Sequence, residues 1–129
     1  VFSNGVFHHI ALADRPRALD YVCRALRPGG LFAFWENNPW NPGTRYVMSR
    51  ISFDRNAVPV WSRQARVMLR AAGFDILHTE FAFIFPRLLR WLRPLESRLA
   101  KFPFGAQYLV LCQKSQTRCT SILDFSTQP

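Results

Sequence analysis

Apolar and polar positions in the first third of the chain fall into strand, helix and strand patterns. Residues 1–3 have the composition of a strand end, and residues 31–35 form an apolar run without alternation, typical of a strand covered on both faces. Between them, apolar side chains at helical spacing predict a helix that Asp14 caps and that ends before Pro28. This order indicates a βαβ unit with parallel strands.

The remaining pattern predicts three more helical segments and two more strands. Helices are expected at 44–51, with Thr44 as the N-cap, and at 56–72, ending at Gly73. An amphipathic helix kinked at Pro94 is expected at 86–101, and a last strand at 106–113. The strand predicted at 74–85 has two faces, with Phe81, Phe83 and Phe85 on one and Ile76 and Ile84 on the other.

Length and composition indicate one folded α/β domain with a basic surface. The chain has 129 residues, of which 49% are hydrophobic and 15% aromatic, which argues against disorder. No apolar run approaches the roughly 18 residues of a membrane span. Three cysteines without metal-type spacing are interpreted as reduced thiols of a cytoplasmic protein. The net charge of +9 favours an anionic partner: nucleic acid, phosphate groups or a membrane surface.

Polar residues follow both strands of the predicted βαβ unit, at 3–9 and 36–38. Ligands gather at the carboxyl ends of parallel strands, so this rim is the expected site. His8 and His9 would point to opposite sides of an extended chain, which excludes a shared metal ion. One of them could accept a proton from a substrate, since a pKa near 6.5 suits that role. The alternative is a hydrogen-bonded structural histidine.

An ordered set of segments resembles the central and C-terminal part of class I S-adenosylmethionine-dependent methyltransferases. The segments are Asn4-Gly5-x-x-His8-His9-Ile10, Leu26-Arg27-Pro28-Gly29-Gly30 before an apolar strand, Glu36 to Arg45, Ala71-Ala72-Gly73-Phe74, and Ala106-Gln107-Tyr108-Leu109-Val110. The resemblance covers about 1–114. It implies a partial Rossmann-like doubly wound sheet with helices on its faces, parallel strands and an antiparallel edge strand.

The resemblance also implies roles for residues at the rim. Ser3, Asn4 and Gly5 would lie beside the methionine part of S-adenosylmethionine, where a residue without a Cβ allows close approach. An ordinary Asn-Gly turn is the alternative. Candidate catalytic residues are His8, His9 and Glu36, and candidate substrate-binding residues are Asn37, Asn38 and Tyr46. Glu36 and the two asparagines could instead bond nearby backbone groups, which is the favoured interpretation for Asn38.

Departures from the family pattern limit what the chain is expected to do alone. Glycine occurs only at positions 5, 29, 30, 43, 73 and 105, so the cofactor-binding G-x-G-x-x-G loop is absent. We therefore expect that the N-terminal half of the domain is missing, that residues 1–114 are its C-terminal part, and that the isolated chain is inactive. Residues 115–129 are expected to form an irregular or disordered tail.

Three functional interpretations follow. The first is methyl transfer to an unknown small or lipid-like acceptor. The second is a basic, non-catalytic module that docks on anionic membrane or nucleic acid, and the third a fragment without a function of its own. The 86–101 segment could contact an anionic membrane, cover the substrate site, or simply cover the core. Nucleic acid is disfavoured because the basic residues are not interleaved with aromatic residues on a strand face.

Overall fold

The computed structural model describes residues 1–52, 57–85 and 87–116. Its sheet contains four strands in the order β1-β2-β4-β3. The strands are β1 (Phe2–Asn4), β2 (Leu31–Asn37), β3 (Phe74–Ala82) and β4 (Gln107–Lys114). The helices are α1 (Arg15–Ala25), α2 (Pro42–Arg50), α3 (Ser62–Ala71) and α4 (Glu96–Leu99), with 3-10 segments η1 (Phe7–His9) and η3 (Arg87–Leu95).

The pairing of the strands confirms the α/β fold class and changes one detail. β1 is parallel to β2, whereas β4 is antiparallel to both β2 and β3. The antiparallel strand expected at the edge is therefore internal, and β3 is the border strand on that side. Strand β1 forms the opposite border of the sheet, and among the described residues it pairs with β2 alone.

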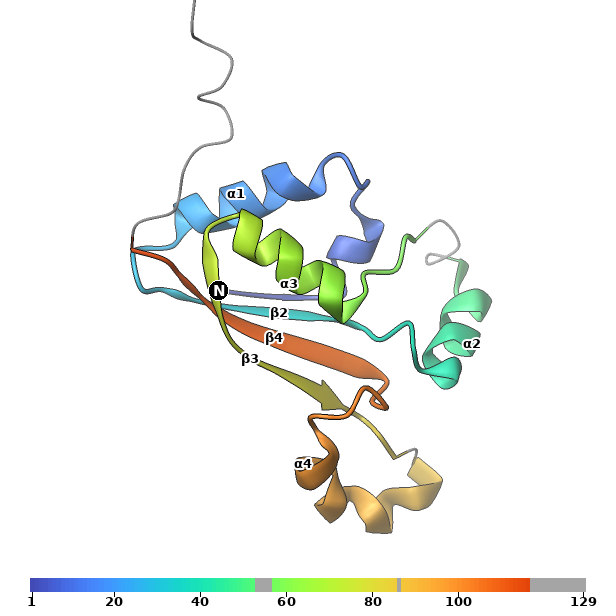
Figure 1. Cartoon of the computed structure of the whole chain (residues 1–129). Helices are drawn as coiled ribbons and strands as arrows, with labels where there is room; N and C mark the ends of the chain where they lie inside the picture. The colour runs from blue at the N-terminus through green and yellow to red at the C-terminus, as the bar shows by residue number, and fades with distance from the viewer. Residues whose placement is uncertain (53–56, 86, 117–129) are drawn as a thin grey trace, which may run out of the picture.

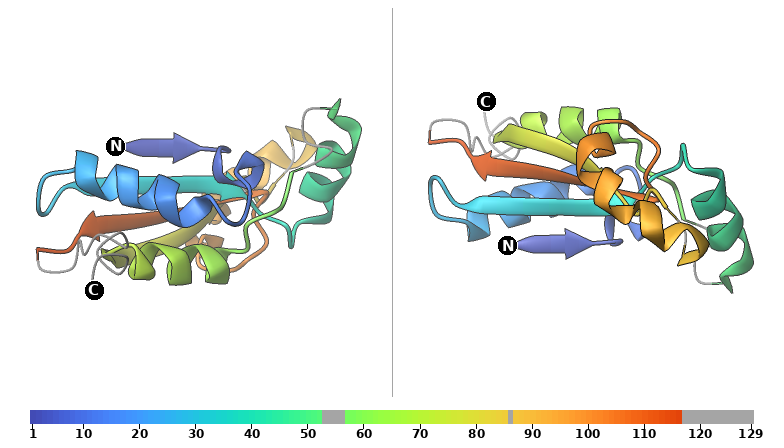
Figure 2. Two further views of the ribbon diagram at one scale, coloured as in Figure 1. Left: turned by 90° about the horizontal axis from the view of Figure 1, so that it is seen from above. Right: turned by 90° about the horizontal axis from the view of Figure 1, so that it is seen from below.

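Helices α1 and α3 cover the same face of the sheet, and the η3–α4 segment lies on the other side at one end (Figures 1 and 2). Alternation along β2 buries Phe32 and Phe34 beneath the two helices, and β4 buries Tyr108 and Val110 in the same layer. The other core residues come from both helices, from β3 and β4, and from the segments at Phe7 and Val60: Phe7, Leu19, Cys23, Val60, Ala65, Leu69, Phe74, Phe81 and Cys112. The core therefore forms between the sheet and these two helices.

A bulge in β3 overturns the predicted faces of that strand. The register shifts between Ile76 and His78, so one additional residue is inserted. Phe81 and Ile76 consequently pack on the same core, although strict alternation placed them on opposite faces. Phe83 lies beyond the end of the strand with φ of 58° and is exposed. A pattern with period two cannot show an inserted residue.

Three predicted helices also differ from those observed. The N-cap of α2 is Asn41, whose Oδ1 accepts a hydrogen bond from the Thr44 backbone N–H at 3.0 Å. Helix α3 begins only at Ser62, and residues 57–61 are not helical, as Pro59 disfavours the helical conformation in the residue before it. The predicted kinked helix at 86–101 is instead a 3-10 segment followed by the short helix α4, with Pro94 inside the 3-10 segment.

Cys23 and Cys112 are fully buried, and Cys112 is a free thiol. Cys23 is disulfide-bonded, so the expectation of reduced thiols is wrong for this residue. Most of the predicted tail, 117–129, lies outside the described residues. Within the described ranges, no helix is long and apolar enough to cross a membrane.

Candidate active-site rim

The ends of β1 and β2 meet as the sequence predicted. Asn4 is the register partner of Trp35, and the Gly5 N–H donates to the Trp35 carbonyl at 2.9 Å. Gly5 has φ of +62°, a left-handed conformation that turns the chain out of β1. The turn delivers η1 directly to the end of β2.

Glu36 joins these two segments through both of its carboxylate oxygens. Its Oε1 accepts from the Phe7 backbone N–H at 2.7 Å, and its Oε2 lies 2.6 Å from the His8 Nδ1. Glu36 is fully buried and His8 is only 4% exposed. A buried carboxylate needs such partners, because loss of hydration is otherwise very costly. Both interpretations left open for Glu36 are thus physically compatible, since it bonds backbone and also contacts a titratable side chain.

The conformation of the two histidines differs from the prediction. Phe7–His9 is a 3-10 turn rather than an extended segment, so the rings of His8 and His9 lie side by side with centroids 4.0 Å apart. His8 is buried and His9 is exposed. At 2.6 Å this contact is a hydrogen bond, so His8 Nδ1 and Glu36 Oε2 share one proton.

Two residues that were not predicted as site residues surround Glu36. The guanidinium of Arg15 donates to the carbonyls of Ile10 at 3.1 Å and Val58 at 2.6 Å. Burial lowers the pKa of Arg15, and the negative charge of Glu36 opposes that change. Burial raises the pKa of Tyr108, with a further contribution from Glu36, and its hydroxyl donates to the Val60 carbonyl at 2.8 Å.

Sequence reasoning missed Arg15 and Tyr108 for different reasons. Arg15 lies beside Pro16 at a helix start, where an arginine is normally solvated, and only the fold buries it. Tyr108 alternates with Val110 and Cys112 on the core face of β4, so its position was predictable but its polar contact was not. Both contacts reach the 57–60 segment, which the sequence pattern assigned to a helix.

The two asparagines after Glu36 have different environments. Asn38 is fully buried; its Nδ2 donates to the carbonyls of Pro103 at 3.0 Å and Gly105 at 2.7 Å, and its Oδ1 accepts from Trp40. These bonds favour the structural interpretation of Asn38. Asn37 lies on the opposite side of β2, where its Oδ1 accepts from Gln107 Nε2 at 3.1 Å. Their predicted substrate contacts stay predictions.

Tyr46 is separated from the Glu36 cluster by its place on α2. Its ring is exposed and stacks with the guanidinium of Arg50, whose central carbon lies 5.1 Å from the ring centroid. The structure gives it no contact with Glu36 or His8 among the described residues. Its predicted role as a substrate contact also stays a prediction.

A groove of about 530 Å³ opens beside β1 and the outer side of α1. It is lined by Ser3, Val6, Phe7, Ile10 and residues of α1 that include Tyr21. The Ser3 hydroxyl is buried without a hydrogen-bond partner among the described residues. An orphaned buried hydroxyl next to a left-handed glycine fits a position where a polar ligand approaches the backbone.

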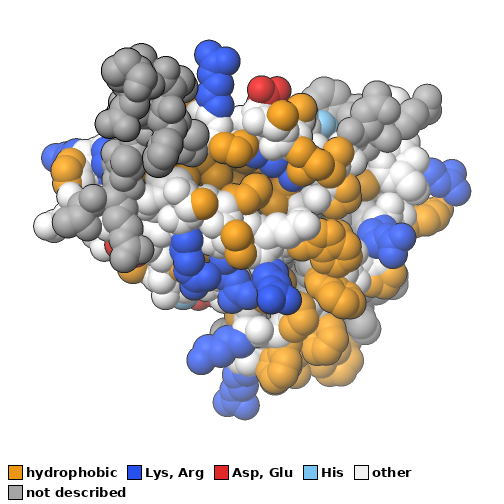
Figure 3. All heavy atoms as spheres, turned by 45° about the horizontal axis from the view of Figure 1, so that its top comes forward, with side chains coloured by type: hydrophobic (Ala, Val, Ile, Leu, Met, Phe, Trp, Pro, Cys, Tyr) orange, Lys and Arg blue, Asp and Glu red, His pale blue; other side chains and the backbone are white. Residues whose placement is uncertain are grey.

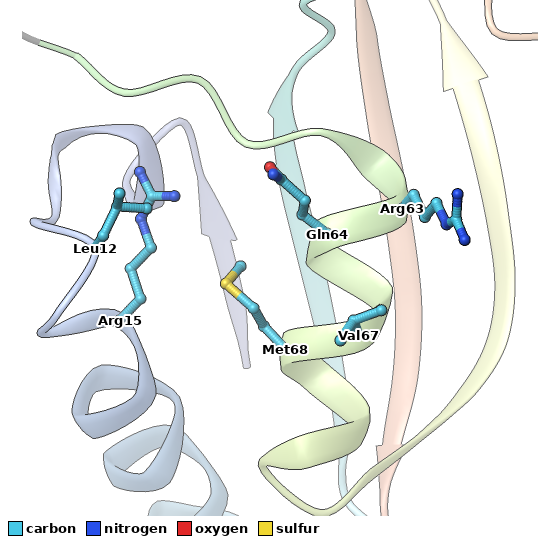
Figure 4. A pocket seen from close by; sticks show the side chains of 6 residues that line it. All are labelled: Leu12, Arg15, Arg63, Gln64, Val67 and Met68. Atoms are coloured by element: carbon cyan, nitrogen blue, oxygen red, sulfur yellow. The ribbon is translucent and has the colours of Figure 1, made fainter.

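A second groove, of about 370 Å³, separates the start of α1 from α3. In Figure 4, Gln64 and Met68 point from α3 toward Leu12 and Arg15, whereas Arg63 points away. Leu12, Val67 and Met68 supply the apolar part of its lining. No cluster of three or more His, Cys, Asp or Glu side chains in the described ranges could hold a metal ion.

Known proteins resemble the chain in part of its sequence and in its fold. Residues 1–34 match a family model described as a methyltransferase domain. A SAM-dependent methyltransferase from Archaeoglobus fulgidus has a similar structure, with a TM-score of 0.67 and 15% identity over 88% of this chain and 58% of that one. One from Mesorhizobium loti gives a TM-score of 0.56 and 20% identity over 88% of this chain and 60% of that one.

The fold of the chain is thus that of S-adenosylmethionine-dependent methyltransferases, and together with the match of residues 1–34 this confirms the resemblance seen in the sequence. It spans about half of the length of the structures it matches. The [4+2]-cyclase SpnF is also similar, with a TM-score of 0.57 and 18% identity over 88% of this chain and 48% of that one. One fold therefore serves more than one reaction. No curated protein sequence is significantly similar to the chain.

Proposed function

We propose that this chain contributes the acceptor-side part of a domain that transfers a methyl group from S-adenosylmethionine to a small or lipid-like acceptor. The observation that carries the proposal is the buried Glu36 contact, which fixes Gly5–His8 against the end of β2. Its partners Phe7 and His8 lie in the segment 1–34 that matches the methyltransferase model, and Glu36 follows two residues after that segment. When bound, S-adenosylmethionine supplies a methyl group already activated on a sulfonium.

The residues of this chain would then act mainly by positioning. Ser3, Asn4 and Gly5 would lie against the methionine part of the cofactor, and the orphaned Ser3 hydroxyl supports this placement. The Glu36 and His8 pair would hold the loop and keep a titratable ring beside the acceptor. Alignment of nucleophile, methyl carbon and sulfur accounts for much of the rate in such transfers. His9, which is exposed, remains the second candidate for accepting a proton from the acceptor.

The cofactor should bind weakly to these 129 residues. They contain no G-x-G-x-x-G loop, and such a loop usually supplies much of the nucleotide binding. We expect no micromolar binding of S-adenosylmethionine in calorimetry and negligible methyl transfer by this chain alone. Micromolar binding would show that the site is complete without the loop and would overturn this part of the proposal.

A sharper test is to find which residues a cofactor analogue contacts when it binds weakly. An amide NMR titration of the ¹⁵N-labelled chain with S-adenosylhomocysteine should shift the signals of 3–9 and 36–38. Adenosine alone, which lacks the amino-acid part, is the control and should leave those signals in place. Shifts confined to other regions, equal shifts with adenosine, or no shifts at millimolar ligand would contradict the proposal.

A further inference from the structure

The η3–α4 end of the molecule presents apolar side chains to solvent beside basic ones. Trp91 is 71% exposed, and Leu95, Phe102 and Phe104 are also exposed. Figure 3 shows hydrophobic side chains gathered at this protruding end with Lys and Arg side chains next to them. We name the exposed residues Arg90, Trp91, Leu95, Arg98, Lys101, Phe102 and Phe104 the aromatic–basic surface.

The charge of this surface complements an anionic partner. Between residues 86 and 104 the sequence has five basic residues and the single acidic residue Glu96, a net charge of +4. Arg90, Arg98 and Lys101 are exposed. A cation near an anionic leaflet strengthens binding by roughly fivefold for each residue, provided that it lies within a Debye length.

The backbone of the loop that carries Phe102 and Phe104 is held by residues that follow β2. The buried Asn38 amide bonds the carbonyls of Pro103 and Gly105, and Asn41 Nδ2 donates to the Phe104 carbonyl at 2.8 Å. A Cβ at Gly105 would lie 2.4 Å from the Ala82 carbonyl oxygen, so the loop packs closely on β3. Phe102 and Phe104 stack with their ring centroids 6.1 Å apart. Rings that are already ordered lose little further entropy when they insert.

We propose that the aromatic–basic surface docks this chain on an anionic lipid membrane, with the rings in the interface and the cations at the headgroups. Trp and Phe favour the boundary between headgroups and acyl chains, where burial of apolar area adds to attraction between charges. A nucleic acid would need bases stacked along an open groove, whereas these rings stack on each other. The proposal goes beyond methyl transfer and does not depend on it.

Co-sedimentation of the whole chain with vesicles tests the proposal. One set contains phosphatidylcholine with about 30% phosphatidylserine, and the other contains phosphatidylcholine alone. We expect binding to the anionic set that weakens as salt rises. The triple variant R90Q/R98Q/K101Q should bind at least about tenfold more weakly. The matched control R17Q/R63Q/R70Q, which removes three exposed arginines near α1 and α3, should lose much less.

A second pair of variants tests the rings. F102S/F104S should weaken binding to anionic vesicles severalfold. The control Y21S, at an exposed ring on α1, should leave that binding unchanged. Circular dichroism verifies that each variant is folded. Absence of binding to anionic vesicles would overturn the proposal. So would equal losses in the two arginine triples, which indicate diffuse charge attraction, or tighter binding of a single-stranded RNA through the same residues. A second copy of the chain on this surface would appear as a dimer that the ring variant abolishes, with vesicle binding absent.

Discussion

Glu36 is the residue on which the arrangement of the rim depends. Its carboxylate is fully buried and bonds one backbone N–H and one histidine. The isosteric change Glu36→Gln removes the charge and one of the two carboxylate oxygens, so the side chain can no longer accept from both Phe7 and His8 through two oxygens. We expect the free energy of unfolding to fall by about 2–4 kcal/mol, measured by urea denaturation.

The chain offers a matched control in a second His–Glu pair. Glu80 lies 3.6 Å from His78 Nε2, and both side chains are about half exposed. Glu80→Gln should change the free energy of unfolding by less than about 1 kcal/mol, because solvent screens such pairs. If Glu36→Gln and Glu80→Gln lower the free energy of unfolding equally, the buried pair contributes no more stability than the exposed one.

Tyr108 should make the protein sensitive to alkaline conditions. Burial raises its pKa in the folded state, whereas an unfolded tyrosine ionises near pH 10. Above about pH 10 the unfolded state therefore holds fewer protons, and stability falls as pH rises. Burial also raises the pKa of Cys112 to about 12, so ionisation of this thiol likewise lowers stability as pH rises. Its effect begins at a lower pH, because an unfolded cysteine ionises near pH 8.5.

Tyr108→Phe isolates the tyrosine contribution. It should cost about 1 kcal/mol at neutral pH, because the hydrogen bond to Val60 is lost. It should also reduce the further loss between pH 7 and about pH 11 by about 1–1.5 kcal/mol. Urea unfolding at several pH values measures both effects. Tyr21→Phe, at a ring exposed to solvent, is the control and should reproduce the parent profile; an unchanged alkaline loss in Tyr108→Phe would refute this account.

At the scale of elements, Asn38 connects the end of β2 to the 103–105 loop. Asn38→Asp replaces a donor of two hydrogen bonds by a buried negative charge that faces two carbonyl oxygens. We expect a loss of about 2–4 kcal/mol, measured by thermal and urea unfolding.

The neighbouring residue provides the comparison. Asn37→Asp keeps the oxygen that accepts from Gln107, so its cost should stay below about 1 kcal/mol. If the two aspartate variants are equally stable, Asn38 does not anchor the loop. The aromatic–basic surface would then lack the support described above.

The order of the elements could be predicted from sequence more fully than their internal details. The switch from helical spacing to the apolar run at 31–35 predicted α1 and β2, and the rim at 3–9 and 36–38 followed from parallel strands. The pairing of Glu36 with His8 did not follow, because a 3-10 turn replaces the extended segment that adjacent histidines suggested. Likewise Pro59 and the bulge after Ile76 change local direction, which periodicity alone does not reveal.

For the whole molecule, the uncovered surfaces of the sheet predict self-association. The outer side of β1 has no strand partner in the described part of the chain, and Phe2 is 77% exposed. Unpaired backbone groups and exposed apolar side chains at a sheet border favour pairing with another copy. Light scattering after size exclusion should show mass that rises from micromolar to millimolar concentration.

Phe2→Lys places a charge on this border and should shift that association to higher concentration. Val67→Lys, at an exposed position on α3, adds the same charge away from β1 and is the control. A monomer at every concentration, or equal effects of the two lysines, would contradict the assignment of association to β1.

We propose that the Glu36–His8 contact holds the loop against which S-adenosylmethionine would bind. The most direct test is the dissociation constant of S-adenosylhomocysteine, from amide NMR titrations of the native chain, Glu36→Gln and Glu80→Gln under conditions where all three are folded. Glu36→Gln should bind about tenfold more weakly, with the signals of 3–9 shifted before ligand is added, and Glu80→Gln should bind as the native chain does. Equal affinities for the native chain and Glu36→Gln would contradict the claim.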